Sequence, residues 1–377
     1  MKIDPAVRKS IFRGISLSLF IYALPVALMY LTFSIKGYKP WQNPLSAGAT
    51  GFLHNWSDYG ISCFVLALGV VEFLSGLYDR DRWDGNEKLT DLVCFAFPLL
   101  VLRPFTTYFG LKLLPLVLPG FKNVFSWVPF WWGFLIICVA DDLTQYWYHR
   151  LHHQIPWLWR FHRTHHSAAY MGMSMASRQN AFYTIFFSQI YLTSALVYLG
   201  LGPSALLAQT IKSMITTLAH SSVTWDKPFY KYRVLNPVAW VLERLISTPA
   251  THHAHHAAAT DDGVGYYKGN FGNMFFLWDV IFGTAHISRQ YPQAYGISHY
   301  EKDQWYAQFL WPVFKSRVEG SELAADGPMV RVDAPPKSRA KLSCDVETLS
   351  RTIAKDRQNP DYYIAHASAY VVSSRKR

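Results

Sequence analysis

The sequence predicts an all-α fold: a polytopic bundle of membrane helices with a helical cap on its cytoplasmic side. Hydrophobic residues make up 51% of the 377 residues and charged residues only 16%, below the roughly 25% charge of soluble domains. Long apolar blocks fill the first two-thirds of the chain, whereas roughly the last sixty residues are charged and rich in Ser, Ala and Pro. Six histidines stand within residues 149–166, directly after an apolar block, and HHAHH follows at 252–256. The cap is expected to carry these histidines.

The first two apolar blocks are each long enough to cross a bilayer. They cover about residues 14–35 and 59–78, and roughly twenty apolar residues span the hydrocarbon core. A cleaved signal peptide would also begin with basic residues before an apolar run, as residues 1–35 do. The length of the run and the further blocks behind it favour an uncleaved membrane anchor.

Two further apolar regions precede the histidines. Region 89–118 is either one kinked span or a short span followed by an interfacial segment, because it is interrupted by Pro98, Arg103, Pro104 and Lys112. A fourth span is predicted at about 127–148, and it runs straight into His149.

The remaining apolar segments, 181–201 and 203–219, are separated by a Gly-Pro pair. They predict a hairpin that either crosses the bilayer or only dips into it. Four basic residues within the first thirteen positions favour a cytoplasmic N-terminus. Counted from there, the fourth span ends in the cytoplasm at His149 and the hairpin returns there at His220. The chain is therefore predicted to be integral and multi-pass, with the histidine clusters and both termini in the cytoplasm.

The net charge of +11 does not indicate nucleic-acid binding. Lys and Arg gather at the ends of apolar blocks and in the tail, as in the cytoplasmic loops of membrane proteins. No recognisable nucleic-acid motif is present. The four cysteines form no C-x-x-C pair, which argues against a thiolate metal site and a disulfide framework.

Glu72, Asp141 and Asp142 stand near the ends of predicted spans. Carboxylates in a membrane are costly and usually partnered, so each is expected to have a partner. For Glu72 a structural partner is favoured over a functional role.

The histidine spacing is typical of metal ligands on helices. His149 and His153 are four residues apart and so project from one helical face. The pattern H-x-x-H-H stands at residues 162–166 and again at 252–256. Imidazole suits iron, zinc and copper, and eight or nine ring nitrogens exceed the four ligands of a tetrahedral zinc. The chain lacks H-E-x-x-H and the E-x-x-H pairs of soluble di-iron bundles. The spacing therefore predicts a site for two metals built from imidazoles.

Longer motifs surround these histidines. They are Asp142 ahead of YWYHR (146–150), LWRFHRTHHS (158–167), TPATHHAHH (248–256) and NFGNMFFLWDVIFGT (270–284). Together, over about residues 135–300, they resemble the fatty acid hydroxylase / sterol desaturase superfamily of integral membrane di-iron enzymes. The combination is specific, whereas any one of these motifs alone would be weak.

The resemblance implies nine metal ligands, with His220 as the isolated histidine between the family's boxes. They are His149, His153, His162, His165, His166, His220, His252, His255 and His256. His152 and His253 occupy positions that the family's pattern leaves free, and are interpreted as neighbours of the site or as incidental.

Four residues are expected to support the ligands: Asp142, Asn180, Trp278 and Asp279. Asp142 lies seven residues before His149, two turns back on the same helix face, where it would accept a hydrogen bond from a ligand ring. The chain departs from the family at two positions. Thr216 stands where fatty acid 2-hydroxylases often have another histidine, and Asn180 stands where many relatives have the histidine of R-x-H-P.

The resemblance also implies an activity. The chain would be an O2-dependent oxidoreductase that hydroxylates or desaturates an aliphatic C–H bond of a lipid, such as a sterol, a fatty acyl chain or a polar lipid. Its cofactors would be two Fe ions (Fe2+/Fe3+) and O2, with zinc able to replace iron in purified protein. No haem or flavin motif is recognisable, so an external electron donor is expected, a reductase with a cytochrome b5-like or ferredoxin-like carrier. The expected domains are N-terminal spans (1–126), a hydroxylase-like catalytic domain (127–300) and a soluble, partly disordered tail (301–377).

Two other classes of protein remain open at this point. One is a histidine-rich metal transporter or metal-buffering membrane protein, whose histidine tracts are usually irregular. The other is a membrane zinc hydrolase. Two irons per chain with O2 consumption would indicate the oxygenase, stoichiometric zinc with hydrolysis the hydrolase, and loose, variable loading the transporter.

Overall fold

The computed structural model describes residues 61–75, 84–260, 263–297 and 302–328. All of them belong to the first of two compact units, Met1–Asp333. Within the described residues the chain is helical, with one isolated bridge and no strand. The all-α prediction is confirmed for this part of the chain. The span predicted at 14–35 and the end of the tail lie outside it.

Helix α3 (Ile61–Ser75) covers most of the span predicted at 59–78. Its Glu72 is buried and accepts hydrogen bonds from the backbone N–H of Met173 at 3.0 Å, the Ser221 hydroxyl at 2.6 Å and the Ser222 N–H at 2.7 Å. The predicted structural partner of this acid is therefore present. It ties α3 to the residues that directly follow His220.

Residues 85–117 form one continuous helix of 33 residues. Of the two arrangements predicted for region 89–118, the structure therefore has the single, interrupted helix. It begins at Asp84, whose carboxylate accepts from the Glu87 N–H at 3.0 Å. Pro98 starts one of its π turns, and Pro104 lies in the first turn of the α-helical segment that follows; proline disrupts the regular α-helical bonding. Its parts are α4 (Gly85–Phe97), η3 (Pro98–Leu102), α5 (Arg103–Tyr108), η4 (Phe109–Leu113) and α6 (Leu114–Val117).

Two described stretches are long and apolar enough to cross a membrane: Gly85–Val117 and Ala181–His220. Large apolar side chains stay exposed along the first of them, with Leu100 75% and Leu116 78% exposed. Such a surface is costly in water and suits contact with lipid. The chain therefore has the features of a membrane protein. The number of crossings and the cytoplasmic location of the site remain predictions.

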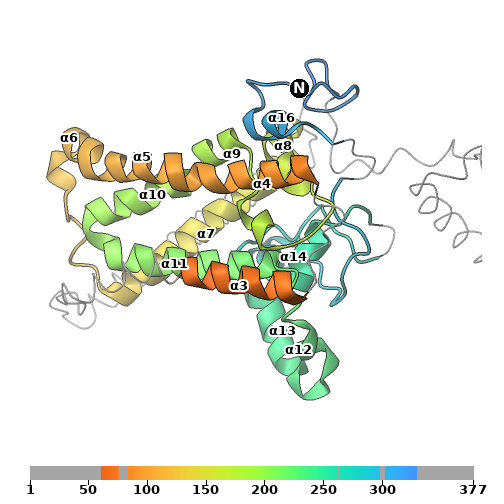
Figure 1. Cartoon of the computed structure of the whole chain (residues 1–377). Helices are drawn as coiled ribbons and strands as arrows, with labels where there is room; N and C mark the ends of the chain where they lie inside the picture. Colours follow the sequence, from red (N-terminus) through yellow and green to blue (C-terminus); the bar gives the residue numbers. More distant parts are fainter. Residues whose placement is uncertain (1–60, 76–83, 261–262, 298–301, 329–377) are drawn as a thin grey trace, which may run out of the picture. The chain divides into compact units, whose positions relative to one another are not determined.

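Residues 181–220 turn back on themselves at Gly200, whose φ is 98°. A Cβ there would also lie 3.0 Å from the backbone nitrogen of Ser126, so glycine is required. Pro203 lies in the first turn of the helix that follows. The predicted hairpin is thus present, with two of its helices side by side (Figure 1). Its elements are α9 (Ala181–Phe186), α10 (Ser188–Leu196), η7 (Val197–Leu201) and α11 (Gly202–His220).

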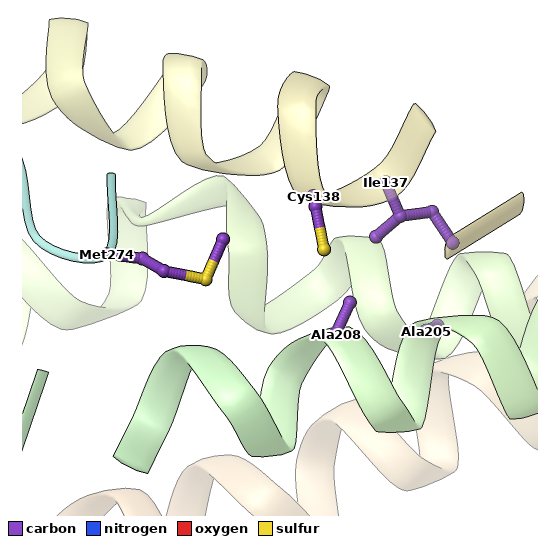
Figure 2. Close-up of a cluster of buried hydrophobic side chains, with 5 residues drawn as sticks. All are labelled: Ile137, Cys138, Ala205, Ala208 and Met274. Carbon is purple, nitrogen blue, oxygen red and sulfur yellow. The ribbon is translucent and has the colours of Figure 1, made fainter. Parts of the chain in front are cut away.

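Helix α7 (Phe130–Gln154) packs against α11 through small side chains. Ala205 and Ala208 of α11 meet Ile137 and Cys138 of α7, and Met274 closes the cluster (Figure 2). Small residues let helix backbones approach closely, as in membrane bundles.

Asp141 and Asp142 interrupt the apolar run of α7. This helix is not one of the two stretches that are apolar enough to cross a membrane, so the crossing at 127–148 stays a prediction. The two acids do have the partner that was expected. Lys212 Nζ of α11 lies 2.8 Å from Asp141 Oδ2 and 3.7 Å from Asp142 Oδ1.

The remaining helices surround the histidines. They are α8 (Pro156–His166), η6 (Met173–Ser177), α12 (Lys227–Lys231), η8 (Arg233–Leu235), α13 (Asn236–Leu245), α14 (Pro249–His255), α15 (Leu277–Phe282) and α16 (Trp305–Leu310).

Residues 302–328, assigned to the soluble tail, pack on α8 instead. Asp303 is fully buried and pairs with Arg163 of α8 at 2.5 Å, and the Thr164 hydroxyl donates to the Gln308 carbonyl at 2.7 Å. A buried cation needs a carboxylate partner, and Asp303 and Glu322 of this segment both pair with Arg163. The compact unit that contains the histidines therefore includes residues 302–328.

Candidate metal centre

The first two histidine boxes meet at a sharp corner between α7 and α8. Pro156 forces the preceding residue out of the helical conformation, and Ile155 is extended, with φ −108° and ψ 112°. Pro156 itself occupies the first turn of α8. The fold-back places the rings of His153 and His162 with their centroids 5.1 Å apart.

The other boxes lie on α11 and α14. His220 is the last residue of α11. The start of α14 is fixed by a reciprocal capping box, in which Thr248 and Thr251 each accept from the other's backbone N–H. This cap sets the position of the final H-x-x-H-H box.

Nine buried histidines form two adjacent groups, and in each group the candidate ligand atoms lie within 4.8 Å of one another. The first group is His149, His153, His162, His166 and His255, and the second is His165, His220, His252 and His256. They are the nine histidines that the sequence singled out. None of their rings is more than 5% exposed.

Each H-x-x-H-H box contributes to both groups. Successive residues of a helix are rotated by about 100°, so His165 projects toward the second group while His162 and His166 project toward the first. On α14 the division is reversed, with only His255 in the first group. The groups adjoin where the rings of His166 and His256 stack with centroids 4.3 Å apart.

Backbone carbonyls determine which ring nitrogen faces each group. A carbonyl only accepts, so a ring Nδ1 beside one carries the proton and its Nε2 keeps a lone pair. The four Nδ1 contacts are His149 to Phe271 O at 2.7 Å, His255 to Gly269 O at 2.7 Å, His220 to Thr216 O at 2.7 Å and His165 to Arg178 O at 3.2 Å.

The resulting Nε2 lone pairs face each other at short range. The Nε2 atoms of His149 and His255 are 3.1 Å apart, and those of His165 and His220 are 3.2 Å apart. Burial lowers the pKa of His255 to about 3 and holds that of His149 well below 6.5, so a shared proton is disfavoured. Two neutral acceptors repel each other, whereas a cation between them is attracted to both.

The donor set therefore fits metal ions. Two nitrogens that bind one metal at about 2.1 Å and at right angles lie about 3.0 Å apart, close to the separations found. Both ring nitrogens of His153 and of His162 are buried and have no hydrogen-bond partner. The same is true of Nε2 of His166. Buried polar atoms are rarely left unsatisfied, and a metal ion would satisfy these.

Asp142 does not accept from a ligand ring, so that prediction is wrong. Its carboxylate accepts from the backbone N–H of Met274 and Phe275 and from the Trp278 indole at 2.9 Å. The physical reason is that Phe271 O already serves His149 Nδ1. Asp142 and Trp278 instead hold the loop that carries this carbonyl.

Asp279 supports the same loop. It accepts from the backbone N–H of Phe271 at 2.9 Å and of Gly272 at 2.7 Å, and from the Thr284 hydroxyl at 2.6 Å. Burial raises the pKa of this carboxyl to about 7. The three donors favour its ionised form.

The other polar residues that the sequence pointed out lie beside the groups rather than in them. Asn180 caps α9 through Phe182 N–H and holds α16 through the carbonyls of Gln308 and Trp311. His152 faces the Tyr148 carbonyl at 2.7 Å. His253 has both ring nitrogens occupied, by the Tyr295 hydroxyl and the Ser221 carbonyl.

Sequence reasoning missed Arg178. It is fully buried and pairs with Glu87 at 2.8 Å and Asp91 at 2.7 Å of α4, while its own carbonyl faces His165. Its partners are about ninety residues away in the chain, so no local pattern could have revealed them.

Comparison with known proteins shows which family this helical, histidine-lined domain resembles. Residues 134–284 match the model of the fatty acid hydroxylase family, inside the predicted 127–300 domain. These residues are therefore similar to a fatty acid hydroxylase domain.

Three relatives illustrate the particular proteins that it resembles. It is 29% identical to human (Homo sapiens) alkylglycerol monooxygenase over 171 residues, which cover 45% of this chain and 34% of the relative. It is 30% identical to the ornithine lipid hydroxylase OlsE of Rhizobium tropici, covering 39% and 40%, and 25% identical to human cholesterol 25-hydroxylase, covering 40% and 50%. The chain thus spans about a third to a half of each relative's length. No solved structure matches it.

Proposed function

We propose that this protein is a membrane-bound, O2-dependent lipid hydroxylase whose nine histidines hold two iron ions. The observation that carries the proposal is the pair of facing Nε2 atoms in each group, which only a cation makes favourable. Hydroxylation is favoured over desaturation because the three relatives described above are named as hydroxylases or as a monooxygenase. The proposed topology is multi-pass, with the site and both termini in the cytoplasm.

Bound iron would supply the reduction of O2 and the oxidation of an aliphatic C–H bond. The overall reaction puts one oxygen atom into the C–H bond and the other into water, and it consumes two electrons and two protons. Those electrons would come from a separate reductase with a cytochrome b5-like or ferredoxin-like carrier.

The chain's own residues would do three things. Backbone carbonyls hold the proton on Nδ1, which keeps Nε2 directed at the metal. Burial of the nine rings keeps water out and the imidazoles neutral. Asp142 and Asp279 hold the loop at 270–278, and with it the Phe271 carbonyl that orients His149.

The substrate class is proposed from the relatives' names. An alkylglycerol, an ornithine lipid and cholesterol each join a long apolar part to a polar group. A metal-buffering role fits less well, because metal exchange calls for accessible ligands and all nine rings are buried.

The proposal predicts that the purified, iron-loaded chain, supplied with reductant, adds one atom of 18O to a lipid under 18O2. The zinc-substituted protein should form no product, because zinc does not change its oxidation state. Mass spectrometry of the lipid measures both results. Label incorporated from H218O by the zinc form would instead identify a hydrolase, and loose, variable metal loading would identify a buffer.

A further inference from the structure

A cavity of about 790 Å³ lies between α4, η6, α7 and α11. Its rim on α4 includes Leu92 and Phe95, which are 60% and 48% exposed on the apolar stretch 85–117. An opening lined in this way admits an apolar chain from the bilayer more readily than a solute from water.

The inner wall of this cavity lies next to the metal centre. Gln145 is one helical turn before His149 on α7, and Thr216 is the residue whose carbonyl faces Nδ1 of His220. Ser177 directly precedes Arg178, whose carbonyl faces His165. The described lining includes no histidine, so neighbours of the ligands, rather than the ligand rings themselves, form this inner wall.

Gln145 is a buried amide whose oxygen has no partner. Gln145 is 8% exposed, and its Oε1 atom makes no hydrogen bond. A buried polar atom without a partner is unfavourable, so the amide is suited to a ligand that supplies one. Two of the three charged residues of the lining form ion pairs, Lys212 with Asp141 and Asp91 with Arg178. The part of the wall that these pairs share with Gln145 therefore suits a neutral polar group rather than an ion.

We propose that the cavity binds the hydroxyl-bearing end of an amphiphilic lipid and that the Gln145 amide hydrogen-bonds to that hydroxyl. A hydroxyl both donates and accepts, so it satisfies the amide in either orientation. The bond would direct the neighbouring carbons of the lipid toward His149 and fix the carbon that reacts. The choice of reacting carbon rests on the proposed function, whereas the binding itself rests only on the cavity and Gln145.

The test is equilibrium binding of 1-hexadecanol and of hexadecane to the iron-loaded full chain in nanodiscs, without O2 or reductant. Gln145→Met keeps the length of the side chain and removes the amide. It should weaken hexadecanol binding about five- to tenfold, the value of one neutral hydrogen bond, and leave hexadecane binding unchanged. Gln154→Met is the matched control: its oxygen is also buried without a partner on α7, but it does not line the cavity. It should bind both lipids as the wild type does.

Iron content and the thermal unfolding midpoint verify that each variant is folded, and Gln145→Asn, which retains an amide, should recover part of the preference. Equal hexadecanol affinity in wild type and Gln145→Met would overturn the inference while leaving the proposed function intact. Conversely, an absence of hydroxylation would refute the proposed function and leave this binding result standing.

Discussion

His162→Ala and His256→Ala should each abolish product formation, by at least about a thousandfold. The two residues belong to different groups, and an oxygenase that uses both metals loses its chemistry when either is lost. Metal content should fall from two ions per chain to one or fewer. Mass spectrometry of the lipid and elemental analysis of the purified variants measure the two effects.

His253→Gln is the control on α14, the helix that His256 directly follows. Its ring nitrogens are occupied by Tyr295 and Ser221, so the variant should keep two metal ions even if it unfolds at a lower temperature. Two metals and full turnover in either His162→Ala or His256→Ala would remove the basis for the proposed ligand set.

Of the variants considered, Arg178→Met should lower the free energy of unfolding the most, by about 3–5 kcal/mol. The substitution removes the buried cation that Glu87 and Asp91 share, and breaking a buried ion pair leaves charge in a medium that solvates it poorly. The backbone carbonyl of Arg178 faces Nδ1 of His165. A shift of residue 178 in the variant should therefore also weaken metal binding in the second group. The midpoint of thermal unfolding in detergent and the metal content give the two readouts.

Lys302→Met removes the corresponding cation from an exposed pair with Asp84 and serves as the comparison. Both side chains are nearly half exposed, and such surface pairs contribute about 0–1 kcal/mol. If the two variants unfold at the same temperature, the pairs around Arg178 are not what joins α4 to the metal centre.

Much of the site could be predicted from the sequence because its ligands come in local patterns. A spacing of four residues puts His149 and His153 on one face, and Ile155-Pro156 marks the corner that returns the chain to His162. Helical periodicity expresses such relations within a few residues. The division of the histidines into two groups depends on how α8 and α14 are oriented toward each other. A local sequence pattern carries no information about that orientation.

The supporting contacts were harder to foresee because they are backbone atoms or distant side chains. The acceptor for His149 is the carbonyl of Phe271, a group that every residue has, so the sequence pointed instead to Asp142. The Lys212 partner of Asp141 and the packing of 302–328 on α8 are both long-range. Such contacts become visible only once the helices are placed.

The most direct test of the account is anomalous scattering at the iron edge from crystals of the iron-loaded protein. It should give two peaks per chain, one within the nitrogens of His149, His153, His162, His166 and His255 and one within those of His165, His220, His252 and His256. A single peak, or iron bound away from these nine rings, would contradict the proposed two-iron site.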